Sequence, residues 1–457
     1  MECILKKIGR LKTYTSKEIE KSYISIDFCC LDRDLFKPEM CYDALAKTGV
    51  KYARCQTGWA KTEKQKGVYD WKWLDDVVNN LCDRGIEPWL CVSFGNPVYM
   101  GELPNPTGVG CVPIHFGEET VEAWKKFARA VAERYKDKVN YFEIWNESQL
   151  NCFWYPEKPN GAELAKLVNI TAKEISDVHP EAKFVVNTCA PTYFQYFEDL
   201  FSNVKKEYLH VFAYHTYSTI PEYRIAEALA EVRRLLKKHG LEHVDLWQGE
   251  GGYPSWAYEG HWLVKEGCDD ERPQAVYQLR RYFIDVSLGA KMSSFFQMAD
   301  MWEKPYEKAT DVIKKPAAHG ILNGLTYTPK KSYETITYLS TLLSGDIKPS
   351  DDFVIAYVWS ENPADSMACQ KMAFDKNGIP VYAYYYPSDL KHELKDPNMV
   401  TINILKKLEN PILIDAFTGE VYELEAPEFN HGYPYNVPIK EYPMVITDKK
   451  AYEIIED

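Results

Sequence analysis

The stretch that decides the fold runs from residue 71 to residue 94 and reads WKWLDDVVNNLCDRGIEPWLCVSF. Its first part, Trp71–Arg84, predicts an amphipathic helix because apolar residues recur on one stripe with a period of 3.6 residues. Its second part, Glu87–Phe94, is a short apolar run that predicts a buried strand. Such helix–strand units, when they repeat, build α/β folds with parallel sheets. The apolar stripe of the helix consists of Trp73, Leu74, Val77, Val78 and Leu81.

The same alternation extends from about residue 22 to about residue 344. Strict alternation implies parallel strands, and eight repeats close naturally into a (β/α)8 TIM barrel. An open, doubly wound sheet is the alternative, and it is disfavoured because no Gly-rich dinucleotide or phosphate loop follows any strand. The predicted strands are Ile24–Phe28, Lys51–Cys55, Glu87–Phe94, Val139–Trp145, Lys183–Thr188, His210–Tyr214, Val244–Gly249 and Lys291–Gln297. The predicted helices are Glu39–Lys47, Trp71–Arg84, Glu119–Lys136, Ala162–Val178, Tyr193–Lys205, Ile225–His239, Gln274–Leu288 and Ser332–Leu343.

The pattern changes after about residue 345, where short strands follow one another with no helix between them. We therefore expect an α/β protein with a barrel domain over residues 22–344 and a C-terminal antiparallel β-sandwich over residues 345–457. Residues 1–21 precede the first barrel strand, and we expect them to add a strand to the sandwich. The strands predicted in the tail are Phe353–Trp359, Met372–Asp375, Val381–Tyr386, Ile412–Asp415, Val421–Leu424 and Met444–Ile446.

Composition narrows the class of protein. A chain of 457 residues suits a barrel of about 250–300 residues plus a smaller module. The net charge of −13 argues against nucleic acid and anionic membranes as partners. The N-terminus MECILKKIGR lacks the apolar region of a signal peptide. The 12 cysteines are scattered along the chain and do not show the spacing of a disulfide framework. We therefore expect a cytoplasmic protein with reduced thiols and leave a homo-oligomer open.

Side chains that follow the strands are the candidates for chemistry, because function in a β/α barrel sits at the C-terminal ends of the strands. Arg54 ends the second strand in YARCQ, and the sixth strand ends FAYHTY. The fourth ends YFEIWNE and the seventh ends LWQGEGGY, which places one glutamate at each rim position. The residues so placed are Arg54, Asn146, Glu147, His215, Tyr217 and Glu250.

The two glutamates predict the reaction. In retaining glycoside hydrolysis one carboxylate attacks the anomeric carbon while another, about 5–5.5 Å away, protonates the leaving oxygen. Arg54 and Tyr217 near Glu250 are expected to keep it ionised, whereas a drier, more apolar setting would keep Glu147 protonated. Asn146 is placed to hydrogen-bond the 2-hydroxyl of the sugar. The aromatic content, with 33 Tyr and 12 Trp, suits rings that cover the apolar faces of sugars.

These motifs resemble clan A of the retaining glycoside hydrolases. The resemblance implies that Glu147, in Trp145-Asn146-Glu147, is the acid/base and that Glu250 is the nucleophile. It further implies that Arg54 orients the nucleophile, that His215 and Tyr217 stand beside it, and that Trp302 is the aromatic platform under the sugar. The C-terminal sandwich resembles the family 39-like branch, which includes β-xylosidases and α-L-iduronidases. Ser148, where proline is frequent in the clan, is a departure from its pattern.

Further candidates for sugar hydroxyl contacts are Asp27, Asn96 and Gln297, and Glu143 is expected to be an inward barrel residue or a partner of Arg54. The sequence thus predicts an exo-acting retaining glycosidase for small β-D-glycosides, or the equivalent α-L-glycosides, with no metal or cofactor. A metal-dependent sugar isomerase or epimerase, liganded by His215, Glu147 and Glu250, is one alternative. A carbohydrate-binding barrel without turnover is the other, and the presence of both glutamates counts against it.

Overall fold

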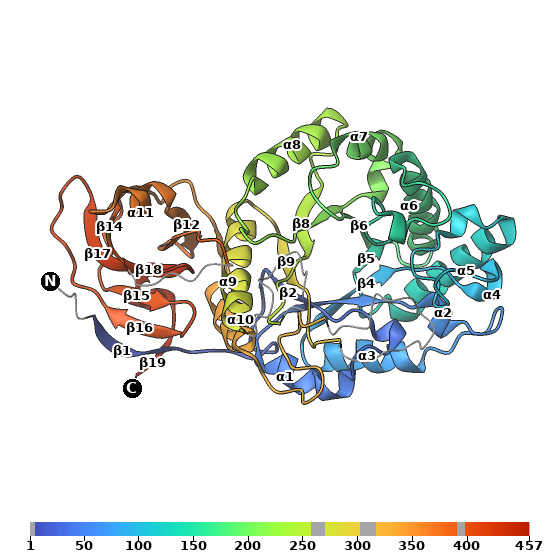
Figure 1. Ribbon diagram of the computed structural model, residues 1–457, viewed down its shortest axis with the longest axis horizontal. Coiled ribbons are helices and arrows are strands. Elements are labelled where there is room, and N and C mark those ends of the chain that lie inside the picture. The colour runs from blue at the N-terminus through green and yellow to red at the C-terminus, as the bar shows by residue number, and fades with distance from the viewer. Residues whose placement is uncertain (1–4, 257–269, 302–316, 391–397, 457) are drawn as a thin grey trace.

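The computed structural model describes residues 5–256, 270–301, 317–390 and 398–456. A closed barrel of eight parallel strands lies beside two antiparallel sheets (Figure 1). The predicted class, a TIM barrel with a C-terminal β-sandwich, is confirmed by this arrangement. Among the described residues, no helix has the length and apolar character needed to cross a bilayer.

Each barrel strand overlaps one of the predicted strands. Neighbouring strands pair in parallel, and Ile24 of β2 pairs with Ser293 of β9 to close the ring. All eight carboxyl ends therefore meet at one mouth, which is what brings distant residues into one site. The strands are β2 (Ile24–Asp27), β3 (Tyr52–Gln56), β4 (Glu87–Val92), β5 (Tyr141–Ile144), β6 (Lys183–Thr188), β7 (Val211–His215), β8 (Asp245–Glu250) and β9 (Met292–Phe295).

A ring of helices covers the outside of the barrel (Figure 1). In α3 the predicted stripe of Leu74, Val77, Val78 and Leu81 is buried, as an amphipathic helix on a barrel requires. Two short helices, α2 (Trp59–Thr62) and α4 (Pro97–Met100), follow β3 and β4. The main helices are α1 (Tyr42–Lys47), α3 (Lys72–Asp83), α5 (Glu118–Tyr135), α6 (Gly161–Ser176), α7 (Phe194–Asn203), α8 (Ile225–Lys238), α9 (Arg272–Ser287) and α10 (Lys331–Leu342).

The second part of the molecule contains an eight-stranded sheet and a three-stranded sheet. The larger sheet has the order β10 (Ile347–Pro349), β12 (Gln370–Lys376), β13 (Ile379–Tyr385), β18 (Met444–Asp448), β15 (Pro411–Asp415), β16 (Glu420–Glu423), β1 (Lys6–Leu11) and β19 (Ile454–Ile455). The smaller has the order β11 (Ile355–Trp359), β14 (Asn398–Ile404) and β17 (Tyr433–Ile439). The expectation that no helix intervenes in this tail is wrong, because α11 (Pro363–Ala368) follows β11. Asn362 caps that helix by accepting from the Ala364 amide.

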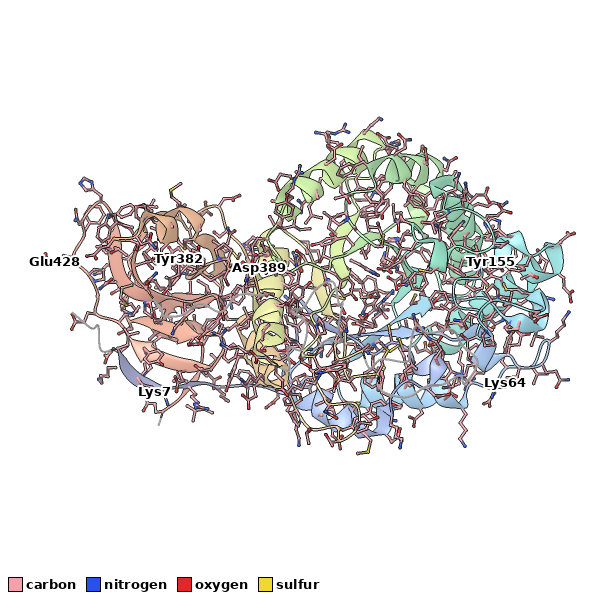
Figure 2. The ribbon with its side chains drawn as sticks, in the orientation of Figure 1. Lys7, Lys64, Tyr155, Tyr382, Asp389 and Glu428 are labelled. Carbon is pink, nitrogen blue, oxygen red and sulfur yellow. The ribbon has the colours of Figure 1, made fainter. Side chains whose placement is uncertain are left out.

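Helices α9 and α10 lie between the barrel and the sheets (Figure 1). Buried Arg280 of α9 binds Glu222 through Nε at 2.8 Å and the Ser388 carbonyl at 2.7 Å. The Tyr385 hydroxyl also donates to Glu222, which ties β13 to the barrel. In Figure 2, Lys7 and Glu428 mark the sheet side, and Lys64 and Tyr155 mark the opposite end of the barrel. These bonds join the two parts, while the domain boundaries at residues 21 and 344 stay predictions.

Candidate active site

Glu147 and Glu250 face one another at the mouth of the barrel. Glu147 follows β5 and Glu250 ends β8, three strands further round the ring. One side-chain atom from each of Glu147, His215 and Glu250 lies within 4.8 Å of the other two. A separation this short fits the roughly 5–5.5 Å between the carboxyl groups of retaining glycosidases, rather than the 6.5–9.5 Å of inverting ones.

Arg54, fully buried on β3, holds three carboxylates together. Its Nε donates to Glu143 at 2.7 Å, and one terminal nitrogen donates to Glu250 at 2.7 Å and to Asp27 at 3.4 Å. The other terminal nitrogen donates to the side-chain oxygen of Asn146 at 2.6 Å. The planar guanidinium thus donates to Glu250 and to Asn146 at the same time and fixes their relative positions. A lysine ammonium cannot supply this geometry. Glu143 is the partner of Arg54 that the sequence allowed for.

Glu250 is held in its ionised form. Burial by itself raises the pKa of this carboxyl, but the positive charges of His215 and Arg54 outweigh burial. Hydrogen bonds from the Tyr217 hydroxyl, at 2.6 Å, and from Arg54 act in the same direction, so the pKa lies below its ordinary value. A lowered pKa suits a carboxylate that has to attack as an anion.

Glu147 has a polar neighbour that the sequence did not indicate. Nδ1 of His215 lies 2.8 Å from one Glu147 oxygen and 3.8 Å from a Glu250 oxygen. Burial lowers the pKa of His215, but the charges of Glu250 and Glu147 outweigh burial and raise it above the ordinary value. The setting of Glu147 is therefore buried but not wholly apolar, since an imidazole shared with Glu250 lies against it.

Asn187, near the end of β6, was missed by the sequence analysis. Its side-chain oxygen accepts from the Glu147 amide at 2.7 Å, and its nitrogen donates to Glu143 at 2.7 Å and to the Trp145 carbonyl at 3.0 Å. Trp145 and Glu147 both have positive φ, 72° and 42°, which non-glycine residues rarely adopt. Asn187 therefore fixes the turn that aims Glu147. The signal was an amide side chain directly after the apolar run FVV, near the carboxyl end of the strand KFVVNT.

The remaining candidates occupy different places. Asp27 is fully buried behind the mouth, accepts from Ser294 at 2.8 Å, and burial raises its pKa to about 8. Asn96 caps α4 and donates to the Glu63 carbonyl at 2.8 Å, so both ends of its amide serve the loops after β3 and β4. Gln297 follows β9, is fully buried, and has neither amide atom hydrogen-bonded. Trp302 lies outside the described residues. Their roles in sugar binding stay predictions.

A cavity of about 940 Å³ opens beside Glu147. Glu147, His215 and Tyr217 line its inner end. Its walls come from the loop after β6, the start of α7, the segment after β7 and the first turns of α8. The cavity therefore leads outward from the Glu147 side of the carboxylate pair.

The positions of Glu147, His215 and Glu250 also bear on the alternative of a metal-dependent isomerase or epimerase. Glu147, His215 and Glu250 do present three ligand atoms close enough for one ion. However, both oxygens of Glu250 already accept from Arg54 and Tyr217. A cation bound there would lie beside the fixed charge of Arg54, which costs affinity. The donor set therefore fits an anionic nucleophile better than a metal ligand.

Comparisons with known proteins agree with this architecture. Residues 38–100 match the glycoside hydrolase 42 family model, described as beta-galactosidase. The structure is similar to a family 39 beta-xylosidase from Caulobacter crescentus, with 16% identity, a TM-score of 0.60, and coverage of 95% of this chain and 97% of that one. A family 39 enzyme from Xanthomonas axonopodis pv. citri (14% identity, TM-score 0.59, covering 96% and 95%) is also similar. So is a family 30 endoxylanase from Clostridium papyrosolvens C71 (9% identity, TM-score 0.61, covering 96% and 97%). The resemblance to clan A glycoside hydrolases, and to their family 39 branch, is thereby confirmed at the level of the fold.

Proposed function

We propose that this protein is an O-glycosyl hydrolase that cleaves the bond of a terminal sugar with retention of configuration. Glu250 attacks the anomeric carbon and Glu147 donates a proton to the leaving oxygen. Water, deprotonated by Glu147, then attacks the glycosyl-enzyme and releases the sugar. The substrate is a small β-D-glycoside or the stereochemically equivalent α-L-glycoside.

One observation carries the proposal. The two carboxylates approach within 4.8 Å across the mouth, and their partners differ: Glu250 accepts from Arg54 and Tyr217, whereas Glu147 contacts the imidazole of His215. That asymmetry separates their roles: Glu250, bound by Arg54 and Tyr217, is the anion, and Glu147, bound by His215, exchanges protons. A carbohydrate-binding barrel has no need of such a difference between the two groups.

His215 supports the proton transfer by Glu147. Its Nδ1 contacts the Glu147 carboxyl at 2.8 Å, and the charges of Glu250 and Glu147 raise the pKa of this imidazole above its ordinary value. Asn146, held by Arg54 at 2.6 Å, keeps its amide nitrogen available for the 2-hydroxyl of the sugar.

The test is chemical rescue of the nucleophile. Wild type and Glu250→Ala are assayed on aryl β-D-xylosides, β-D-galactosides and β-D-glucosides and on aryl α-L-arabinosides. We expect Glu250→Ala to lose at least about a thousandfold in kcat. Azide should restore turnover and give a glycosyl azide of inverted configuration. Hydrolysis of an aryl monosaccharide glycoside by wild type would also support exo action.

A matched control separates chemistry from folding. Glu207→Ala removes an exposed glutamate and should keep full activity. Undiminished turnover in Glu250→Ala would refute the nucleophile. Glycan binding by a wild-type protein that is inactive on every glycoside would support the carbohydrate-binding alternative instead.

A further inference from the structure

We infer that the cavity beside Glu147 binds an apolar, ring-bearing aglycone in preference to a second sugar. The inference rests on the proposed function, because it takes Glu147 as the donor of the proton to the leaving oxygen. The leaving group must then lie on the Glu147 side of the bond. The cavity of about 940 Å³ is lined there by Glu147, whereas Arg54 and Asn146 on the other side form no part of its described wall.

The size of the cavity exceeds what one sugar ring needs. A volume of about 940 Å³ is at the upper end of the range of about 300–1,000 Å³ for small-molecule sites. The wall is continuous from the carboxyl of Glu147 to the surface, so an aglycone attached to a bound sugar can extend along it. A site of this size therefore accommodates a group larger than a methyl or a single hydroxylated ring.

The chemistry of the wall is mainly apolar. Six of its lining residues have side chains without hydrogen-bonding groups: Leu150, Pro191, Phe194, Pro221, Ile225 and Ala228. At the outer end Tyr193 and Tyr223 are 41% and 71% exposed, which leaves ring surface for stacking. A disaccharide aglycone would bury several hydroxyls against this wall, and each unpaired polar group costs free energy.

Part of the polar lining is engaged by the protein, whereas the charged side chains of Arg224 and Glu227 are exposed at the solvent side of the wall. The Ser218 hydroxyl donates to the Ile220 carbonyl at 2.9 Å, and Arg281 is paired with Asp285. Glu231 is bound to Arg234 at 2.7 Å. Thr216 has a buried hydroxyl oxygen without a hydrogen-bond partner, which can serve one polar substituent. The wall thus suits a ring with few polar groups, such as a phenyl or terpenoid-like alcohol.

The test compares three alcohols as leaving groups, of which the hexose hydroxyl is the most acidic, so that intrinsic leaving ability does not favour the expected result. The sugar is the one found with the aryl glycosides above, carried by 2-phenylethanol, by methanol and by a second hexose in a disaccharide. We expect kcat/KM to be at least about tenfold higher for the 2-phenylethyl glycoside than for the other two, because only its ring fills the cavity. An equal or higher kcat/KM for the disaccharide would overturn the inference and leave the proposed function standing.

Substitutions of the two exposed tyrosines test whether the preference for the 2-phenylethyl glycoside comes from the cavity wall. Tyr193→Ala and Tyr223→Ala should each lower kcat/KM for the 2-phenylethyl glycoside by about three- to tenfold. Hydrolysis of the glycosyl fluoride, whose leaving group is too small to touch the wall, should not change. Tyr357→Ala, which removes a similarly exposed ring on β11, is the control. Loss of fluoride hydrolysis in the two variants would contradict a role confined to the aglycone, and failure of wild type on every substrate would refute the proposed function itself.

Discussion

The Tyr217 hydroxyl provides a sensitive test of the assigned roles. It donates to Glu250 at 2.6 Å, and Tyr217→Phe removes that bond while keeping the ring. In the second step Glu250 leaves the sugar and regains its negative charge, so a donor on its oxygen stabilises that transition state. A hydrogen bond to a charged group contributes about 1.5–3 kcal/mol, which corresponds to about a 10- to 150-fold change in rate.

We therefore expect kcat of Tyr217→Phe to fall by about 10- to 100-fold through slower release of the sugar. KM should fall as well, because the glycosyl-enzyme accumulates. Rapid mixing with an aryl glycoside should show a burst of phenol followed by a slow steady state. Loss of the donor also raises the pKa of Glu250, so the acid limb of kcat/KM should move to higher pH.

The control for this variant is Tyr277→Phe. Its hydroxyl donates at 2.8 Å to the carbonyl of Thr216, next to Tyr217, but does not contact Glu250. This variant should keep the kinetics of the wild type. A kcat for Tyr217→Phe equal to that of the wild type, or a rise in KM without a burst, would refute the assignment of Glu250 as the group that leaves.

Three further changes test the surroundings of the site. Asn187→Ala should lower kcat/KM about tenfold, more for poor leaving groups than for activated aryl glycosides, because it loosens the turn that aims Glu147; an equal loss on both substrate types would contradict a role in proton donation. Asp27→Asn should become more stable than wild type as pH rises from about 4 to about 8. The reason is that the folded pKa of Asp27, about 8, lies above its ordinary value of 3.8, so the folded wild type resists ionisation across that window; melting curves whose difference is constant with pH would count against this. Arg280→Met should cost about 3–5 kcal/mol in urea unfolding by leaving the partly buried Glu222 without its cation, and adding Glu222→Gln should recover part of it; no recovery would mean that packing, not charge, dominates.

The barrel was predictable because its signals are local. Each strand is a short apolar run and each main helix has a buried stripe, as α3 shows with Leu74 and Leu81. The rim glutamates were predictable for the same reason, since the end of a strand fixes which residues reach the mouth. Contacts between side chains that are distant in the sequence were not predicted. The contact between His215 and Glu147 joins β7 to the loop after β5 and depends on the closed ring.

The tail was harder to predict because its strands break the usual rules. β17 contains Pro434 and Pro438, which remove ladder donors, and the strand persists because it lies at the edge of its sheet. α11 has only six residues and depends on the cap from Asn362 rather than on an apolar stripe. Neither feature carries the periodicity from which strands and helices are recognised.

The position of β1 has a consequence for how the protein is made. This strand, Lys6–Leu11, pairs on one side with β16 and on the other with β19, so it is synthesised long before its partners. More than 400 residues separate Arg10 from Glu420 and Ile455, its neighbours in the ladder. During synthesis the barrel can close around its own local contacts, whereas β1 must wait unpaired until β16 and β19 emerge. Completion of this sheet is therefore a later step than closure of the barrel.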